Sequence, residues 1–277
     1  MVGHAERKIL VFDNLIATNE LVDLTGRRVL LTGAASGIGE AMAFRFADAG
    51  AECVLLDLNE PLLNKVAHKL MAAGASVSAH KVDLSDRQQI VDLWTGLEHR
   101  LPDILINNAG IYMLKDYLEM DKDFFDLTMA VNLESVLWMC QEFIKRRLEA
   151  GGTIVNISTI EAILPFKKDL VAYGTSKAAV IGLTRALARD YGPHDFRVNA
   201  ILPGAIKTPG TREIMKTAIR KMQLDLIKTG YDFQSRLALG RWGNPDEIAR
   251  VALFLSTEMA SYVQGAVIPV DGGFLSS

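Results

Sequence analysis

Tyr173 and Lys177 are spaced so that they could act together as an acid–base pair. They lie four residues apart, so within a helix both side chains would share one face. A nearby ammonium stabilises a phenolate, and Lys177 would therefore lower the pKa of Tyr173. Moving a phenol from ~10 to ~7 takes roughly 4 kcal/mol, more than an exposed lysine supplies, so a second positive charge such as an oxidised nicotinamide is needed. A solvent-exposed helix face could show the same spacing by chance, so the other motifs of the chain must distinguish a catalytic pair from such a face.

The composition is that of an ordinary globular protein. Of the 277 residues, 49% are hydrophobic and 23% charged, and the net charge is −3. This balance gives no reason to expect a nucleic-acid or membrane partner. Cys53 and Cys140 fall inside expected core elements, which fits a reducing compartment. No run approaches the ~18 apolar residues of a membrane span, and the N-terminus lacks a secretory apolar segment, so we expect a cytoplasmic protein.

Short apolar runs alternate with longer amphipathic segments along the chain. Such alternation predicts βαβ units and a parallel sheet, and strands without two-residue periodicity indicate that both faces are buried. We expect strands near 29–31, 53–56, 77–82, 104–106, 153–157, 198–201 and 267–270, and helices near 38–49, 60–73, 86–99, 121–148, 173–191 and 245–256. The sequence therefore predicts an α/β fold, a single doubly wound Rossmann-type domain whose seven-stranded parallel sheet carries helices on both faces.

The junction of the first expected strand and helix carries glycines at positions 33, 37 and 39. Their spacing, G-x-x-x-G-x-G, differs from the usual G-x-G-x-x-G, but it allows the same tight turn and close approach to a pyrophosphate at a helix N-terminus. Asp57 ends the second expected strand, where a carboxylate would bind the adenosine ribose and repel a 2′-phosphate. Ser36 and Leu58 offer no positive charge to such a phosphate. We therefore expect NAD, with NADP less favoured.

Taken together, these motifs resemble the classical short-chain dehydrogenase/reductase family over about residues 24–274. The matching segments, in the family's order, are 32–39, Asp83-Leu84, 107–110, Asn132, 152–159, Tyr173 with Lys177, Pro203-Gly204 with Thr208, and 270–273. The resemblance implies that Tyr173 is the catalytic acid/base. It implies that Lys177 lowers the pKa of this tyrosine and binds the nicotinamide ribose, and that Asn132 supports a proton relay through water.

The resemblance also implies a set of coenzyme contacts. Asp83 and Leu84 would meet the adenine, 108–110 would line the adenosine side, and Ile206 and Thr208 would hold the nicotinamide carboxamide. The expected coenzyme-binding residues are Gly33, Ser36, Gly37, Ile38, Gly39, Asp57, Leu58, Asp83, Leu84, Asn108, Ala109, Gly110, Tyr173, Lys177, Pro203, Gly204, Ile206 and Thr208. No metal site is expected, because the five histidines show no ligand spacing.

One position departs from the family's pattern. The family usually has a serine thirteen residues before the tyrosine, and here that offset falls on Ile160, which has no hydroxyl. Aligning the strand at 152–158 instead places Thr159 in the serine position, with one extra residue in the following loop. A threonine keeps the hydroxyl that would bind a substrate oxygen. Ser158 is the competing candidate, and we favour Thr159.

Two segments near the expected site could contact substrate. Glu161 and Phe166 lie in the loop after Thr159 and are expected substrate contacts, with Lys167 and Lys168 beside them. A long insertion at about 209–236 is expected to act as a substrate lid. The lid's cations could meet an anionic substrate or face solvent: Arg212, Lys216, Arg220 and Lys221.

The sequence thus predicts an NAD-dependent oxidoreductase that transfers a hydride between a secondary alcohol or ketone and a nicotinamide. An NADPH-dependent 3-oxoacyl-[acyl-carrier-protein] reductase is the alternative, and a non-catalytic binding protein of the same family is a more distant one. Residues 1–24 are expected to be an N-terminal extension and 25–277 a single NAD-binding catalytic domain. The resemblance implies a homotetramer (or dimer) formed through 173–191 and 266–271.

Overall fold

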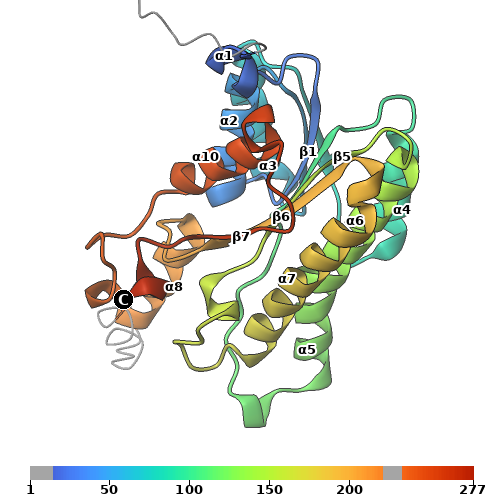
Figure 1. Ribbon diagram of the computed structural model, residues 1–277. Coiled ribbons are helices and arrows are strands. Elements are labelled where there is room, and N and C mark those ends of the chain that lie inside the picture. Colours follow the sequence, from blue (N-terminus) through green and yellow to red (C-terminus); the bar gives the residue numbers. More distant parts are fainter. Residues whose placement is uncertain (1–14, 221–232) are drawn as a thin grey trace, which may run out of the picture.

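Seven parallel strands form the centre of the computed structural model, which describes residues 15–220 and 233–277 (Figure 1). They lie in the order β3-β2-β1-β4-β5-β6-β7, and every neighbouring pair is parallel. The strands are β1 (Arg28–Thr32), β2 (Glu52–Asp57), β3 (Val77–Lys81), β4 (Ile104–Asn107), β5 (Gly152–Ile157), β6 (Phe196–Pro203) and β7 (Val267–Val270). The predicted fold class is confirmed.

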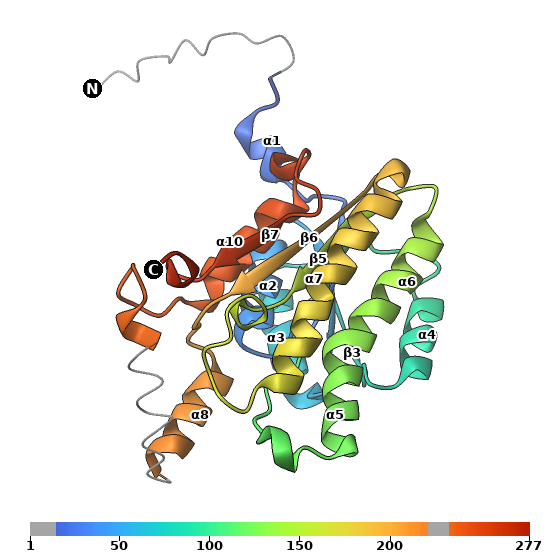
Figure 2. The ribbon, with the colours of Figure 1, turned by 60° about the horizontal axis from the view of Figure 1, so that its bottom comes forward.

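Helices cover both faces of this sheet (Figures 1 and 2). One face carries α2 (Gly37–Asp48), α3 (Glu60–Ala72) and α10 (Pro245–Ser256). The other face carries α4 (Arg87–Gly96), α5 (Lys122–Met129), α6 (Ser135–Arg147) and α7 (Val171–Tyr191). Within the described residues, α1 (Thr18–Val22) and α8 (Pro209–Arg220) lie at the margins. The sheet therefore has no broad face left to solvent.

Burial on both faces explains why the strands read as continuous apolar runs. In β1, Val29 and Leu31 pack into the core beneath α2, α3 and α10. Leu30, between them, packs into the core beneath α4, α6 and α7. Each such side chain is at most 1% exposed, which stabilises the fold by roughly 1.5–3 kcal/mol per residue. A strand with polar residues on one face could not occupy this position.

The order of the strands creates a crevice at their carboxyl ends. After β1 the chain continues to β2 and β3 on one side, then returns to place β4 on the other side of β1. Loops leaving β1 and β4 diverge at such a reversal, and ligands of open α/β sheets bind there. The Thr32 hydroxyl joins the two strand ends, because it accepts hydrogen bonds from the backbone N–H groups of Asn108 and Ala109, both at 2.9 Å.

The segment expected as one helix near 121–148 is divided. A π-helical turn, Ala130–Glu134, separates α5 from α6. Such turns accommodate one extra residue inside a helix and often lie at functional sites. Here the turn contains Asn132, which is fully buried. Periodicity alone did not reveal the interruption, because the hydrophobic residues continue through it.

The chain ends and the expected lid are partly described. Leu24, the last residue of the expected extension, is 3% exposed and its backbone N–H donates to the carbonyl of Ala49 at 2.8 Å. Residues 1–14 and, within the expected lid, 221–232, with Lys221, lie outside the described residues. The lid's first part is α8. Among the described residues, no helix has the length and apolar character needed to cross a membrane.

Candidate active site

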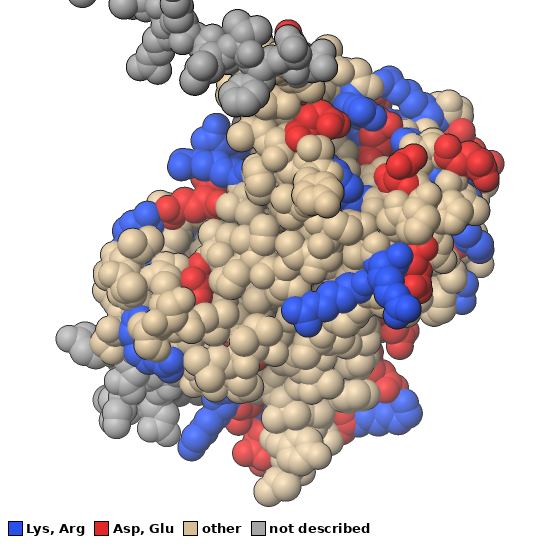
Figure 3. Space-filling view, in the orientation of Figure 1, with Lys and Arg blue, Asp and Glu red and all other residues tan. Residues whose placement is uncertain are grey.

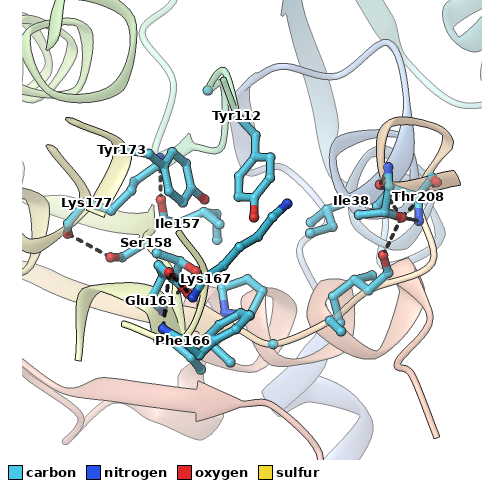
Figure 4. Close-up of a pocket in the computed structure, with 18 of the residues that line it drawn as sticks. Ile38, Tyr112, Ile157, Ser158, Glu161, Phe166, Lys167, Tyr173, Lys177 and Thr208 are labelled. Carbon is cyan, nitrogen blue, oxygen red and sulfur yellow. Dashed lines mark hydrogen bonds between the residues drawn. The ribbon is translucent and has the colours of Figure 1, made fainter. Parts of the chain in front are cut away.

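The helix α7 presents Tyr173 and Lys177 toward the carboxyl end of β5. The Lys177 ammonium is buried, at 3% exposure for the residue, and donates to the carbonyl of Ile157 at 2.9 Å. The Tyr173 ring meets the Tyr112 ring edge-on, with centroids 4.8 Å apart. Figure 4 shows the two tyrosines next to each other at a shared cavity. The pair therefore shares an interior helix face and does not form a solvated surface.

Burial dominates the electrostatics of this pair. It raises the pKa of Tyr173 to about 12; a hydrogen bond with the Thr159 hydroxyl opposes the rise, and the charge of Glu161 adds to it. Burial also lowers the pKa of Lys177 to about 8. The expectation that Lys177 lowers the pKa of Tyr173 is therefore not met by the protein's own groups. The physical reason is that desolvation of the phenolate outweighs every favourable contact that the chain provides.

The two candidate hydroxyls after β5 have different partners. The Ser158 hydroxyl donates to the backbone carbonyl of Lys177 at 2.8 Å, which joins the strand end to α7. The Thr159 hydroxyl accepts from the N–H of Glu161 at 3.3 Å, and it acts to lower the pKa of Tyr173. The Ser158 hydroxyl is therefore engaged with the backbone, whereas that of Thr159 lies near the phenol.

Asn132 is held by the backbone after β4. Its side-chain amide donates to the carbonyl of Ile111 at 2.9 Å and accepts from the N–H of the same residue at 2.8 Å. A Cβ on Gly110 would lie 3.1 Å from the Asn132 oxygen and 3.3 Å from the Lys177 ammonium. A side chain at this position would therefore press on both groups and require them to shift. Asn132 is thus a neighbour of the Lys177 end of the site.

The glycine-rich turn packs tightly against the end of β4. A Cβ on Gly33, whose φ is +66°, would lie 2.9 Å from the Cα of Ala109. A Cβ on Gly39 would lie 1.9 Å from the carbonyl oxygen of Gly33, so the helix could not approach the turn with any larger residue. The Asn108 amide donates to that same carbonyl at 3.1 Å. In the described structure, no side-chain bond caps α2 at Ser36, which leaves its first N–H groups facing the crevice.

The carboxylate of Asp57 lies beside this turn. One oxygen accepts from the N–H of Ala35 at 3.0 Å and the other from the N–H of Asn59 at 2.8 Å. Each oxygen keeps a second lone pair for a ligand hydroxyl. Leu58 is 60% exposed and adds no charge. The carboxylate is therefore positioned by backbone groups on both sides.

Two further expected coenzyme segments lie along the same edge of the sheet. After β3, Asp83 accepts from the N–H and hydroxyl of Ser85, and Leu84 is buried. After β6, Ile206 is buried and the Thr208 hydroxyl accepts from the N–H of Thr211 at 3.1 Å. Both loops leave the carboxyl ends of parallel strands, although four strands of the sheet lie between β3 and β6.

A cavity of about 360 Å³ joins several of these segments. Figure 4 shows Ile38 and Thr208 across it from Tyr173, with Tyr112 and Lys167 between them. Of the expected site residues, its lining includes Ile38, Asn108, Gly110, Ser158, Thr159, Glu161, Phe166, Tyr173, Lys177, Pro203, Gly204, Ile206 and Thr208. The expected residues that do not line it are Gly33, Ser36, Gly37, Gly39, Asp57, Leu58, Asp83, Leu84, Ala109 and Asn132.

Glu161 shapes the loop that borders the cavity. One of its carboxylate oxygens accepts from the N–H groups of Phe166 and Lys167, at 3.3 and 3.2 Å. Burial raises the pKa of the Glu161 carboxyl and lowers the pKa of the Lys167 ammonium. The Phe166 ring packs against Phe233 and Phe274, with centroids 4.7 and 5.0 Å away. The loop is therefore tied both to itself and to the C-terminal segment.

Five further lining residues were not named individually as site residues from the sequence: Tyr112, Lys167, Thr211, Phe233 and Trp242. Lys167 lies in the expected substrate loop, and Thr211 and Phe233 lie within the expected lid. Tyr112 follows shortly after the segment at 107–110, a position that could have indicated it. Trp242 carries no local signal, because only the folded chain brings it to the site. Among the described residues, no three His, Cys, Asp or Glu side chains form a group that could hold a metal ion.

Comparison with known proteins finds relatives that align with nearly the whole chain. A family profile described as enoyl-(acyl carrier protein) reductase matches residues 33–275. A 3-oxoacyl-[acyl-carrier-protein] reductase of Thermotoga maritima is 34% identical over 91% of this chain and 99% of its own length. An NAD-dependent glycerol dehydrogenase of Listeria innocua is 35% identical, over 91% of this chain and 95% of that protein.

The fold has close structural counterparts as well. The crystal structure of a gluconate 5-dehydrogenase from Burkholderia cenocepacia, in complex with NADP and tartrate, superposes with a TM-score of 0.85. That alignment covers 94% of this chain and all of the other, at 28% sequence identity.

The buried Lys177 ammonium predicts a pH-dependent stability. The unfolded chain keeps this proton up to about pH 10.5, whereas the folded chain releases it near pH 8. Between these values the unfolded state binds more protons, so the free energy of unfolding rises with pH, by about 3 kcal/mol for this group. Denaturant titrations at several pH values should show this rise in the wild type and not in Lys177→Met. Parallel pH profiles for the two proteins would contradict it.

Proposed function

The chain belongs to the classical short-chain dehydrogenase/reductase family, and on that basis we propose that it transfers a hydride between a nicotinamide coenzyme and a secondary alcohol or ketone. The observation that carries the proposal is that Tyr173, the Thr159 hydroxyl and the buried Lys177 all line the wall of one cavity. An acid/base group, a hydroxyl that can hold a substrate oxygen and a cation are the groups this reaction requires of the protein.

Each of these residues has a distinct role in the proposal. Tyr173 takes the proton from the substrate hydroxyl during oxidation and returns it during reduction. Thr159 donates a hydrogen bond to the same substrate oxygen. Lys177 holds the site positive and binds the coenzyme ribose, and Asn132 connects the site to solvent. A bound nicotinamide coenzyme supplies the hydride acceptor or donor, together with a positive charge in its oxidised form.

The chain's residues fit such a coenzyme. Gly33 and Gly39 let the turn pack closely against the end of β4 and against the start of α2, and a helix N-terminus after such a turn can bind a pyrophosphate. Asp83, Leu84 and 108–110 would hold the adenosine part. The segment from Pro203 to Thr208 would hold the nicotinamide part.

We favour NAD over NADP as the coenzyme. The Asp57 carboxylate lies beside the glycine-rich turn, where it can accept from ribose hydroxyls and would repel a 2′-phosphate. The relatives divide on this point, since one is described as NAD-dependent and another is in complex with NADP. The preference therefore rests on Asp57 and not on the comparisons.

The alternative function is NADPH-dependent reduction of a 3-oxoacyl group on a carrier protein. It is favoured by the 34% identity to a 3-oxoacyl-[acyl-carrier-protein] reductase over nearly all of that protein. The carboxylate of Asp57 argues against it, because it disfavours a coenzyme with a 2′-phosphate. Coenzyme preference separates the two functions.

We further propose that the chain forms a homotetramer through α7 and β7. Figure 3 shows few charged side chains across the centre of the face that these elements help to form, apart from one band of Lys and Arg. Tyr262, near β7 in sequence, is fully exposed. Depletion of charged residues and enrichment in aromatic residues are typical of association surfaces. Light scattering on protein eluting from a sizing column should give four times the chain mass; the mass of a single chain would overturn this proposal.

Replacement of Tyr173 by phenylalanine tests the acid/base role. Tyr173→Phe should lower kcat/KM for a secondary alcohol on the order of 10³-fold, because the proton has no acceptor. Thr159→Val should lower it about 10²-fold through loss of one hydrogen-bond donor. Coenzyme binding, followed by fluorescence, should persist in both variants. More than a few per cent of wild-type turnover in Tyr173→Phe would remove this residue from the mechanism.

Ser158→Ala is the matched control for the threonine. Its hydroxyl bonds a backbone carbonyl, so its loss should reduce stability by about 1 kcal/mol and kcat/KM much less than Thr159→Val does. The opposite order of the two effects would make Ser158 the working hydroxyl.

Replacement of Asp57 tests the coenzyme preference. Asp57→Ala removes the ribose contact and the repulsion of a 2′-phosphate, so the ratio of kcat/KM with NAD to that with NADP should fall at least about tenfold. Asp48→Ala, at the far end of α2, changes the net charge equally and should leave the ratio unchanged. An unaltered ratio in Asp57→Ala would show that this carboxylate does not select the coenzyme.

A further inference from the structure

Glu161 has one carboxylate oxygen that the chain leaves without a partner. The residue is 3% exposed, and its Oε1 accepts from two backbone N–H groups of its own loop. Its Oε2 is buried, with no hydrogen-bond partner among the described residues. A buried polar atom without a partner costs about 1–3 kcal/mol, so one that persists beside a binding cavity indicates a partner supplied by the ligand.

Lys167 brings a second polar group to the same cavity. Its ammonium lies 5.1 Å from the centre of the Tyr112 ring, and Figure 4 shows its side chain extending across the cavity from the loop. It forms no hydrogen bond or ion pair with the part of the chain that the structure describes, although it experiences the negative charges of Glu161 and Asp169. It is therefore a donor directed at whatever enters the cavity.

The Glu161 carboxylate and the Lys167 ammonium lie in a cavity whose remaining wall is mostly apolar. Apart from the catalytic residues, the lining on this side is apolar or aromatic: Ile111, Ile160, Phe166, Phe233 and Trp242. In a mainly apolar cavity, a few placed polar groups decide the orientation and identity of the ligand. Glu161 offers an acceptor and Lys167 a donor, on neighbouring parts of one loop.

We propose that Glu161 and Lys167 select substrates that carry a second hydroxyl next to the reacting carbon, that is, neutral vicinal diols and polyols. This inference rests on the proposed alcohol oxidation at Tyr173. A hydroxyl donates to Glu161 and accepts from Lys167 at the same time. A carboxylate at that position only accepts and is repelled by Glu161, and an alkyl group leaves both side chains unpaired. A site built to bind a hydroxyl discriminates strongly against an analogue without one.

Three alcohols that differ at a single carbon test the selection. Propan-2-ol, propane-1,2-diol and lactate share the reacting carbon and its methyl group, and carry methyl, hydroxymethyl and carboxylate as the third substituent. With the full-length wild-type protein and NAD⁺ or NADP⁺, kcat/KM for the diol should exceed that for each of the other two at least about tenfold.

Variants then assign the preference to the two side chains. Glu161→Gln keeps an oxygen for the loop's N–H groups but turns the second position into a donor, so the ratio of diol to propan-2-ol should fall toward one. Lys167→Met should lower the same ratio. Lys168→Met, an exposed neighbour in the same loop, is the matched control and should keep the wild-type ratio.

The possible failures are distinguishable. If Glu161→Gln lowers kcat/KM for the diol and for propan-2-ol by the same factor, Glu161 only holds the loop through its backbone contacts. This result would overturn the proposal. So would a wild-type preference for lactate, or equal use of propan-2-ol and the diol. In each of these cases the proposed hydride transfer would still stand if the wild type oxidises an alcohol and the Tyr173→Phe variant does not. Absence of turnover of all three alcohols with both coenzymes would overturn the two proposals together.

Discussion

The hydrogen bond from the Lys177 ammonium to the carbonyl of Ile157 is the interaction on which the arrangement of the site depends. It fixes α7 against the end of β5, and so determines where Tyr173 stands relative to Thr159. Burying this cation is unfavourable, as its lowered pKa shows. The surrounding chain adapts to it: Gly110 lacks a side chain where one would meet the ammonium, and Ser158 binds the lysine's own backbone carbonyl. Burial of the Lys177 ammonium lowers the stability of the folded chain, but it keeps a cation beside Tyr173.

The two halves of the cavity are built by different means. On the coenzyme side, backbone groups and glycines at the ends of β1 and β4 set the shape, and the Thr32 hydroxyl joins them. On the substrate side, side chains from the loop after Thr159 and from the C-terminal segment form the wall, held by the packing of Phe166, Phe233 and Phe274. The shape of the coenzyme side follows from the topology of the sheet. The side chains of the substrate side can differ without disturbing the sheet.

Sequence reasoning recovered what is encoded locally. The seven strands, the glycine-rich turn and the Tyr173–Lys177 spacing all have short-range signatures, and the fold class followed from them. The raised pKa of Tyr173 did not follow, because burial of the phenol and its distance from the charge of Glu161 are set only by the folded chain. Likewise, Trp242 reaches the cavity through long-range packing that no local pattern records, and the expected lid did not indicate that Phe233 would be the residue to line it.

The π-helical turn between α5 and α6 changes the direction in which the side chains of α6 point relative to those of α5. One additional residue rotates everything after it by about 100° relative to a continuous α-helix. The buried stripe of α6 is therefore out of phase with that of α5, and a helical wheel drawn through both would mix inward and outward positions. A single-residue deletion near Asn132 could restore a regular helix in principle, yet it would turn either this amide or the core face of α6 away from its partners. The extra residue thus allows Asn132 to face the backbone of Ile111 while the apolar side of α6 faces the core.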